Sequence, residues 1–368
     1  MNKKNLELIT ALRHELHAHP ELSGQEHWTR QHLMKFLREH TALMIVDCGN
    51  WFYAVCKSPA GEKKPVAFRA DFDAVPVEDQ SGKPYASKNP GVGHMCGHDG
   101  HTSALAGLAL ELDQTGSQRD VYLIFQHAEE TGQGALECAG LLDEIDIEEI
   151  FAFHTAPHIP QGFVLVRDGS GNCASKGMIL RFEGAIAHAS RPEDGRNPAP
   201  AIAAVIAAIP SLSAGYQGIV MCTVIHVRIG SPAFGTSPGE GVLMLTIRGE
   251  YEAEMDVLQA DIEALAREEA FRHGLKCAFE YCDVFPEIVN HPASAQKVRE
   301  AALKQGLKIY EQDSPTRWSE DFGHYLKRTK GAFFKIGVGP DCAPLHSTKY
   351  DFPDSILETA VEVFKSLV

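Results

Sequence analysis

The sequence has no long hydrophobic run and no segment typical of a secretory signal. No stretch approaches the roughly 20 consecutive apolar residues that a membrane-spanning helix needs. The first residues, Met1 to Lys4, lead into mixed polar and apolar residues, whereas a signal peptide would continue with an apolar segment. These absences argue against a membrane protein and against export.

Positive charge is also scarce. The 34 Lys and Arg residues against 49 Asp and Glu residues give a formal net charge of -15. Nucleic acids and anionic membranes select basic patches, and none is visible along the chain, so we expect a small-molecule partner, no nucleic acid and no membrane. The nine scattered cysteines are an odd number, which is typical of free thiols in a reducing compartment. The expected location is cytoplasmic.

The length predicts more than one domain. A chain of 368 residues is too long for one ordinary hydrophobic core, and its 44% hydrophobic and 23% charged residues are typical of a folded globular protein. Residues 6–16, 28–37 and 102–110 have the spacing of helices, and residues 42–46 and 51–57 that of short strands. The alternation predicts an α/β fold.

Four further apolar runs end abruptly in potential ligand residues. They are residues 66–70 before Asp71 and Asp73, 121–125 before residues 127–130, 150–153 before His154, and 332–338 before a loop with His346. In open α/β sheets, binding sites lie beyond the carboxyl ends of the strands, where residues distant in sequence converge. We therefore expect an open mixed or parallel sheet with helices on both faces.

A second organisation appears between residues 177 and 286. Strand-like runs at 178–182, 221–229, 242–248 and 277–281 alternate with helical segments at 199–209 and 255–273. This β-α-β-β-α-β order predicts a smaller α+β domain, a lid or dimerisation domain inserted into the first. Because His346 follows the insert, the catalytic domain is expected to be discontinuous, with residues 1–176 and 287–368.

The densest cluster of potential ligands is Gly93-His94-Met95-Cys96-Gly97-His98-Asp99-Gly100-His101. Thiolate and imidazole are ligands that borderline divalent ions such as zinc prefer, and glycines allow the tight backbone that such a site needs. The strand ends supply further candidates, so that five residues are enough for two ions sharing a bridge: Cys96, His98, Glu130, His154 and His346.

Each candidate also has a simpler interpretation. Asp71 or His154 alone could cap a strand end or be a partly buried polar residue. His94, His101 and His127 fall within the same motifs, but each is equally well explained as a loop or helix-start residue, and we leave them outside the predicted ligand set. The prediction of a metal site therefore depends on the candidates taken together.

The adjacent Glu129 and Glu130 form the second informative pair. They follow an apolar strand and precede a turn, and successive side chains at a strand end point in different directions. One can bind a metal while the other acts as the general base toward water. Asp73 is then a candidate carboxylate for orienting a ligand imidazole.

These motifs occur together with others in one order. The set comprises Arg13-His14-x-x-His17-x-His19-Pro20-Glu21-Leu22-Ser23 with Glu26 and Thr29, Arg69-Ala70-Asp71-Phe72-Asp73-Ala74, the cysteine motif above, His127-Ala128-Glu129-Glu130, Phe153-His154, Ser319-Glu320-Asp321-Phe322 and Pro344-Leu345-His346. Over nearly its whole length the chain resembles the aminoacylase and amidohydrolase branch of the dinuclear metallopeptidases, which includes hippurate hydrolases, auxin-amino-acid conjugate hydrolases and N-acetyldiaminopimelate deacetylases.

The resemblance implies roles for individual residues. Cys96 would bridge two divalent ions, with Glu130 and His346 completing one site and His98 and His154 the other. Glu129 would be the general acid/base. His188, in the inserted domain, would polarise the scissile carbonyl from its own or a partner subunit, although it could also be an ordinary loop histidine.

One segment departs from the family pattern. Relatives usually carry Asn-Val-Ile-Pro after a Gly-Gly turn, whereas this chain has Gly235 in place of the asparagine, within the segment from Gly230 to Gly239. The substrate contacts of the inserted domain are thereby in doubt. Arg248, at a strand end of that domain, is a candidate to bind a substrate carboxylate, although such arginines are more often solvated.

The predicted reaction is hydrolysis of the amide bond of an N-acyl amino acid by metal-activated water, with Glu129 as general acid/base. The ions could be zinc, manganese, cobalt or nickel. A dipeptidase or aminopeptidase would use the same residues, and a metal-binding protein without activity would not need Glu129 beside Glu130. A sheet edge of the inserted domain is a candidate surface for a homodimer; the alternative is an edge that is blocked against pairing.

Overall fold

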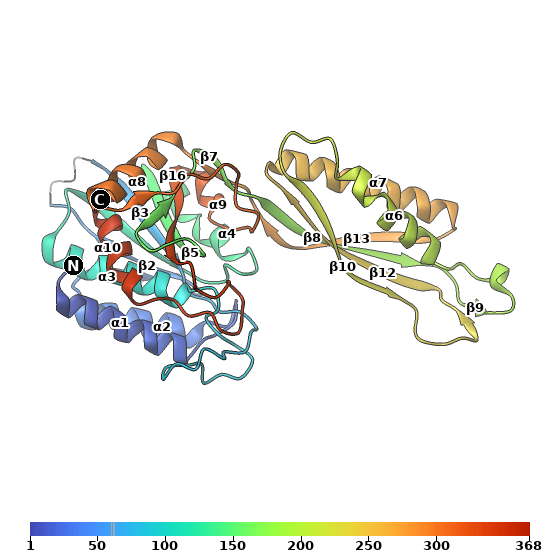
Figure 1. Cartoon of the computed structure of the whole chain (residues 1–368), viewed down its shortest axis with the longest axis horizontal. Coiled ribbons are helices and arrows are strands. Elements are labelled where there is room, and N and C mark those ends of the chain that lie inside the picture. Colours follow the sequence, from blue (N-terminus) through green and yellow to red (C-terminus); the bar gives the residue numbers. More distant parts are fainter. Residues whose placement is uncertain (60, 62) are drawn as a thin grey trace. The chain divides into compact units, whose positions relative to one another are not determined.

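The computed structural model describes residues 1–59, 61 and 63–368 (Figure 1). The chain divides into two compact units. The first comprises Met1–Gly171, Ile288–Pro315 and Glu320–Val368, and the second comprises Asn172–Glu287 and Thr316–Ser319. No helix in these described residues has the combined length and apolar character that crossing a membrane requires.

The unit boundaries differ from the expected ones at two places. The second unit begins at Asn172 instead of residue 177, and it takes in Thr316–Ser319, which we expected in the first domain. Hydrogen bonds explain both differences: the Cys173 N–H donates to the Thr316 carbonyl (2.9 Å), and Arg248 Nη1 donates to Ser319 Oγ (2.9 Å). Contacts between segments so distant in sequence are not visible in a hydropathy pattern.

A mixed sheet forms the centre of the first unit. In the described residues its strand order is β1-β2-β4-β3-β5-β16-β6-β15. The central strands β4, β3, β5 and β16 are mutually parallel, whereas β1, β2 and β6 each pair antiparallel with a neighbour. The strands are β1 (Met44–Asp47), β2 (Phe52–Cys56), β3 (Lys63–Asp71), β4 (Arg119–Gln126), β5 (Glu149–Pro157), β6 (Phe163–Leu165), β15 (Lys308–Ile309) and β16 (Lys330–Gly339).

Helices cover both faces of this sheet (Figure 1). On one face, Phe68, Leu123 and Phe151 share a core with helical residues such as Leu105 and Phe364. The helices of that core are α1 (Lys3–Ala18), α2 (His27–His40), α3 (His98–Thr115), α8 (Pro292–Lys304) and α10 (Ser355–Leu367).

On the other face, the short helix α9 (Gly323–Leu326) brings Tyr325 to within 2.9 Å of Gln126 Oε1 in β4. The nearby short helices are α4 (Gly134–Cys138) and α5 (Leu141–Glu144). The expected α/β class and the strands and helices read from the sequence are confirmed, apart from shifts of a few residues at their ends. One helix starts earlier than expected: α3 begins at His98, so His98 to His101 form its first turn.

The second unit is an antiparallel sheet with two helices. The strand order is β10-β12-β8-β13. Alternate residues of β8 and β12, such as Leu180 and Leu243, pack against Ile202 of α6 and Leu258 of α7. Its elements are β8 (Ala174–Glu183), β9 (Ala187–His188), a 3₁₀ turn (Pro192–Asp194), α6 (Ala199–Leu212), β10 (Val220–Ile229), β11 (Thr236–Ser237), β12 (Glu240–Gly249), α7 (Glu252–Arg272) and β13 (Lys276–Phe285).

Two further pairs of short strands complete the chain. Strand β9 pairs with β11, and β7 (Gly169–Asn172) pairs with β14 (Ile288–Asn290). In β9 and β11, His188 lies opposite Thr236. Apart from the short strands β9 and β11 and the 3₁₀ turn, the elements from β8 to β13 follow one another in the order β-α-β-β-α-β.

Candidate metal centre

The five candidate ligands converge at the carboxyl edge of the central strands. Cys96 Sγ lies 3.4 Å from His154 Nε2 and 3.3 Å from His346 Nε2. Glu130 Oε1 lies 3.2 Å from His346 Nε2 and 3.7 Å from His98 Nε2. Ligands that surround one tetrahedral ion at zinc-like bond lengths are about 3.4–3.8 Å apart. The five side chains therefore have the mutual spacing of metal ligands.

These side chains form two groups that share the thiol. Cys96 belongs with His98 and His154 to one group and with Glu130 and His346 to another, and within each group the ligand atoms lie within 4.8 Å of one another. Each group would provide three ligands for one ion.

One atom of this cluster tests whether a cation fits. His98 Nε2 is buried and has no hydrogen-bond partner among the described residues. Buried polar atoms are nearly always satisfied, so this nitrogen calls for a further partner. A cation held by Cys96, His98 and His154 would satisfy it.

Local backbone geometry brings the loop ligands into place. Gly97 adopts φ +90°, and a Cβ at this position would lie 2.8 Å from the Tyr350 hydroxyl oxygen, so the glycine lets the chain turn from Cys96 directly into α3. His346 adopts φ +59°, and its N–H donates to the Met95 carbonyl at 2.7 Å. This hydrogen bond ties the His346 loop to the cysteine loop.

Asp73 lies beside the ring of His98. The Asp73 carboxylate Oδ1 is 3.1 Å from His98 Nδ1, which leaves Nε2 directed at Glu130. The other oxygen, Oδ2, accepts the Glu130 N–H at 3.0 Å. Burial lowers the pKa of His98, but the Asp71 and Asp73 carboxylates outweigh it and raise this pKa to about 10. Asp73 thus orients two candidate ligands at once.

His101, which we left outside the ligand set, is already engaged. Its Nδ1 is 2.9 Å from Asp71 Oδ1, and its Nε2 accepts the Thr155 N–H at 3.2 Å. Two other histidines were set aside. His127 Nε2 lies 3.2 Å from Glu137 Oε2. His94 is buried, and neither of its ring nitrogens forms a hydrogen bond with a described residue.

Glu129 lies beside the ligand cluster and is buried. One oxygen, Oε2, is 4.0 Å from His98 Nε2, and the other accepts the Asp321 N–H at 3.3 Å. Burial, together with the negative charges of Glu320, Glu130 and Asp321, raises the pKa of Glu129 well above its ordinary value. A buried carboxyl group beside the candidate ligands is placed to accept and return a proton.

Sequence reasoning missed the charged network beneath Glu129. The fully buried Arg69 donates to Asp71 Oδ2 (2.7 Å), Glu320 Oε1 (2.9 Å) and Asp321 Oδ1 (2.7 Å). The available signal was an arginine inside the apolar run of β3, because a buried arginine requires carboxylate partners. The sequence does not say which carboxylates these are.

His188 and Arg248 both lie in the second unit. His188 is exposed, with Nδ1 2.7 Å from Ser190 Oγ. Arg248 Nη1 donates to the Arg317 carbonyl (3.1 Å) as well as to Ser319 Oγ, so its guanidinium is not simply solvated. A Cβ at Gly235 would meet no atom within 4 Å, so the position of the missing asparagine is open.

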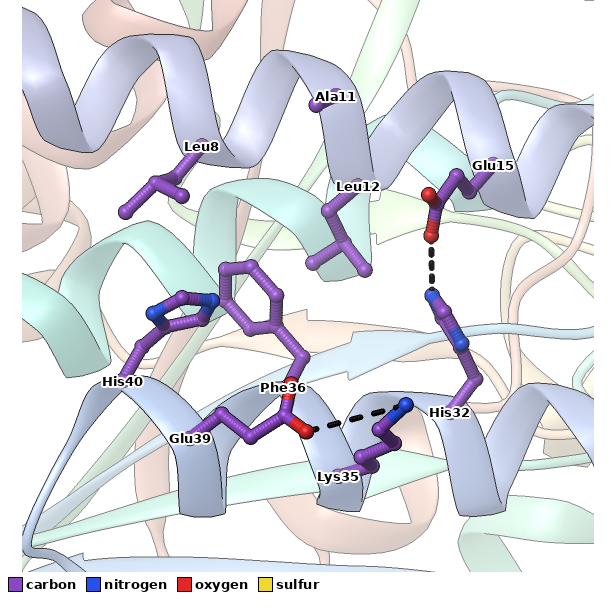
Figure 2. Close-up of a pocket in the computed structure, with 9 residues that line it drawn as sticks. All are labelled: Leu8, Ala11, Leu12, Glu15, His32, Lys35, Phe36, Glu39 and His40. Atoms are coloured by element: carbon purple, nitrogen blue, oxygen red, sulfur yellow. Dashed lines mark ion pairs between the residues drawn. The ribbon is translucent and has the colours of Figure 1, made fainter.

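A surface hollow of 290 Å³ lies elsewhere, between α1 and α2 (Figure 2). Glu15 and His32 form an ion pair across it at 2.7 Å, and Phe36 and Leu12 contribute its apolar wall. None of its lining residues belongs to the ligand cluster. The hollow is therefore separate from the candidate metal centre.

Comparison with known proteins identifies the family of this chain. The sequence model of peptidase family M20/M25/M40 matches residues 67–368. The putative amidohydrolase YhaA of Bacillus subtilis is 30% identical over 369 residues, covering 97% of this chain and 93% of that protein.

Two solved structures share the whole architecture. A putative aminohydrolase from methicillin-resistant Staphylococcus aureus aligns with a TM-score of 0.88 at 26% identity, covering 99% of this chain and 97% of the other. The YXEP protein of Bacillus subtilis, described as a dinuclear metal-binding peptidase of the M20 family, aligns with a TM-score of 0.84 at 25% identity, covering 100% and 98%. The chain therefore belongs to peptidase family M20/M25/M40 and is a metal-dependent hydrolase of that family.

Proposed function

We propose that this protein hydrolyses the amide bond of N-acyl amino acids with two divalent metal ions. The observation that supports it most is the pair of ligand groups sharing Cys96, with the carboxyl group of Glu129 beside them. The description of YXEP as dinuclear supports the same number of ions. An acyl substrate also accords with the description of YhaA as a putative amidohydrolase.

Each ligand would have a defined place. Cys96, Glu130 and His346 would hold one ion, and Cys96, His98 and His154 the other. When bound, such ions supply Lewis acidity, which makes water more acidic and stabilises negative charge on a carbonyl oxygen. Thiolate and imidazole ligands suit zinc, and manganese, cobalt or nickel would fit the same atoms.

Glu129 would transfer the proton of the reaction. As the water oxygen forms its bond to the amide carbon, the Glu129 carboxylate accepts the proton that water loses. As the carbon–nitrogen bond breaks, Glu129 returns this proton to the leaving nitrogen, so that the products are a carboxylic acid and an amine. Asp73 would keep the His98 ring and the Glu130 backbone in place throughout.

The second unit would supply the substrate contacts. His188 would donate to the oxyanion that develops on the scissile carbonyl, and Arg248 would bind the substrate carboxylate. The open space at Gly235, in place of the usual asparagine, would alter which acyl group or amino acid is accepted.

Amine release from a panel of N-acyl amino acids tests this function. The purified protein is assayed as isolated, after chelation, and with zinc, manganese, cobalt or nickel restored. We expect hydrolysis of some members that chelation abolishes and metal restores. Free-amine dipeptides are the matched controls, because cleavage of these alone would replace the deacylase proposal with a dipeptidase.

We also propose that the protein acts in the cytoplasm as a homodimer joined through the second unit. All nine cysteines are free, which suits a reducing compartment. Strand β10 is an edge strand that exposes Val224, Ile225 (59% exposed) and Val227, and an apolar edge favours pairing with another strand.

Light scattering coupled to size-exclusion chromatography tests the dimer. Ile225→Lys places a charge on the β10 edge and is expected to convert a dimer to a monomer. Val257→Lys, which charges an exposed apolar position of α7 in the same unit, is the control. A monomeric wild-type protein would exclude the dimer.

A further inference from the structure

The turn that carries Glu129 and Glu130 has a strained backbone. Ala128, immediately before Glu129, adopts φ +46°, a left-handed conformation that disfavours residues with a Cβ. Its carbonyl accepts hydrogen bonds from the N–H groups of Gln133 (3.3 Å) and Gly134 (3.0 Å), which close the turn. A Cβ at Gly134 would lie 1.7 Å from the His127 carbonyl oxygen, so this closure requires glycine.

A residue from far earlier in the chain holds Ala128 in this conformation. Glu26, at the N-terminus of α2, is 5% exposed, and its Oε1 accepts the Ala128 N–H at 2.8 Å. Without this acceptor the Ala128 N–H would be buried and unpaired, and rotation of the peptide would be the way to satisfy it. The strained conformation therefore depends on the reach of the Glu26 side chain.

The segment containing Glu26 also contacts the neighbouring strand end. The Glu21 carbonyl accepts the Ala74 N–H (2.9 Å), and Ser23 Oγ donates to Asp73 Oδ2 (2.7 Å). The same Asp73 oxygen accepts the Glu130 N–H. Residues 21–26 thus form hydrogen bonds beyond the ends of both β3 and β4. Among them, Glu26 is the residue that accepts a hydrogen bond from the backbone next to Glu129.

We propose that Glu26 is a positioning residue, whose hydrogen bond to Ala128 directs Glu129 and Glu130 to their separate places in the site. This inference rests on the proposed function. Rotation about Ala128 would displace the following carboxyl groups, and a misplacement of about 1 Å can cost on the order of 10²-fold in rate. Glu26 itself takes no part in the proton transfer.

Two conservative variants separate the reach of the side chain from its carboxyl group. Glu26→Gln keeps an oxygen at the same distance, and because burial and the nearby Asp73 raise the pKa of Glu26 to about 8, the neutral amide resembles the native side chain at pH 7. Glu26→Asp keeps the carboxyl group but is one methylene shorter. We expect kcat within about 3-fold of wild type for Glu26→Gln and about 10²-fold lower for Glu26→Asp, with KM little changed.

Glycine at position 128 supplies a rescue. Ala128→Gly adopts positive φ without the steric penalty, so in the Glu26→Asp background it should recover about 10-fold in kcat or more. The matched control is Asp120→Glu. Asp120 makes the same kind of carboxylate hydrogen bond, to the Ser58 N–H at 2.8 Å, at the opposite end of β4, and its variant should leave kcat unchanged.

A second readout does not depend on catalysis. In the cobalt-loaded protein, the visible absorption bands report the arrangement of the ligands, Glu130 included. We expect these bands to change in Glu26→Asp and to persist in Glu26→Gln. Thermal unfolding followed by circular dichroism verifies that each variant is folded.

The outcomes distinguish this inference from the proposed function. Wild-type kinetics and cobalt bands in Glu26→Asp would overturn it. Equal losses in Glu26→Asp and Glu26→Gln would also overturn it, because the reach of the side chain would then not account for the effect. If the wild-type protein is inactive on every substrate, the proposed function is wrong. The cobalt bands would still test the role of Glu26.

Discussion

The interiors of the two units differ in what they bury. In the first unit, charged side chains such as Arg69, Asp73 and Glu129 lie buried at the carboxyl edge of the sheet. In the second unit, Glu250 and Glu269 are the Asp, Glu, Lys, Arg or His residues among those described that reach a similar burial, and its core is otherwise apolar. Both sheets are covered by helices, so burial of charge is not a consequence of sheet packing itself.

The difference indicates what each unit contributes. Burying a charge destabilises a protein unless partners compensate it, so a fold gains nothing in stability from a cluster of buried carboxylates. Such clusters are typical of functional sites, where the reaction requires ionisable groups. In the first unit, the buried carboxylates around the candidate metal centre reduce the stability of the fold. The second unit has an ordinary hydrophobic core.

The largest expected effect is on catalysis at Glu129. Glu129→Gln removes the proposed proton acceptor and should lower kcat by about 10²–10⁴-fold. Glu129 is not a member of either ligand group that shares Cys96, so the variant should retain its metal, measured by elemental analysis after dialysis.

Glu130→Gln is the paired variant, and it should lose metal. Equal loss of metal from both variants would favour a metal-binding protein without activity. Retention of metal with loss of activity in Glu129→Gln would exclude that alternative.

The next effect concerns the buried charge network of the first unit. Arg69→Met leaves Asp71, Glu320 and Asp321 buried without their cation, and the free energy of unfolding should fall by about 3–5 kcal/mol. Urea denaturation followed by circular dichroism measures the change. Wild-type stability in this variant would show that the carboxylates do not depend on Arg69.

The contribution of His17 in α1 to the free energy of unfolding is expected to depend on pH. Burial lowers its pKa, but Asp99 (2.8 Å) and Asp79 (3.3 Å) outweigh it and raise this pKa to about 9. A folded pKa above the unfolded value of about 6.5 means that the stabilisation is complete below pH 6.5 and is lost as the pH rises toward 9.

Comparison of the wild type with His17→Gln isolates this contribution. The difference in unfolding free energy between the two proteins should decrease by about 3 kcal/mol between pH 6 and pH 9. A difference that is constant with pH would mean that His17 is not protonated in the folded protein.

The smallest effect is expected at a surface ion pair of the second unit. Arg181 Nε lies 2.7 Å from Glu280 Oε1, and both side chains are exposed. Solvent screens such pairs, so Arg181→Met should leave the urea midpoint unchanged within experimental error. A loss comparable to that of Arg69→Met would contradict the distinction between the two units.

The convergence of the candidate ligands could be predicted from the sequence because it follows a simple rule of topology. Residues 66–70, 121–125 and 150–153 lie in neighbouring parallel strands of the sheet. The residues at or just after the ends of these strands therefore lie along one edge of the sheet. The network under Glu129 could not be read in this way. Arg69 and Glu320 are separated by 251 residues, and no periodic pattern connects them.

The sequence by itself determined the α/β class, the second sheet with its two helices, and the residue types able to bind metal at strand ends. These depend on local hydrophobic periodicity and on ligand chemistry. The tertiary structure alone decided which groups meet: Thr316–Ser319 with the second unit, Arg69 with its three carboxylates, and Glu26 with Ala128. Such contacts join segments far apart in the chain, and only the order of strands and the packing of helices bring them within hydrogen-bonding distance.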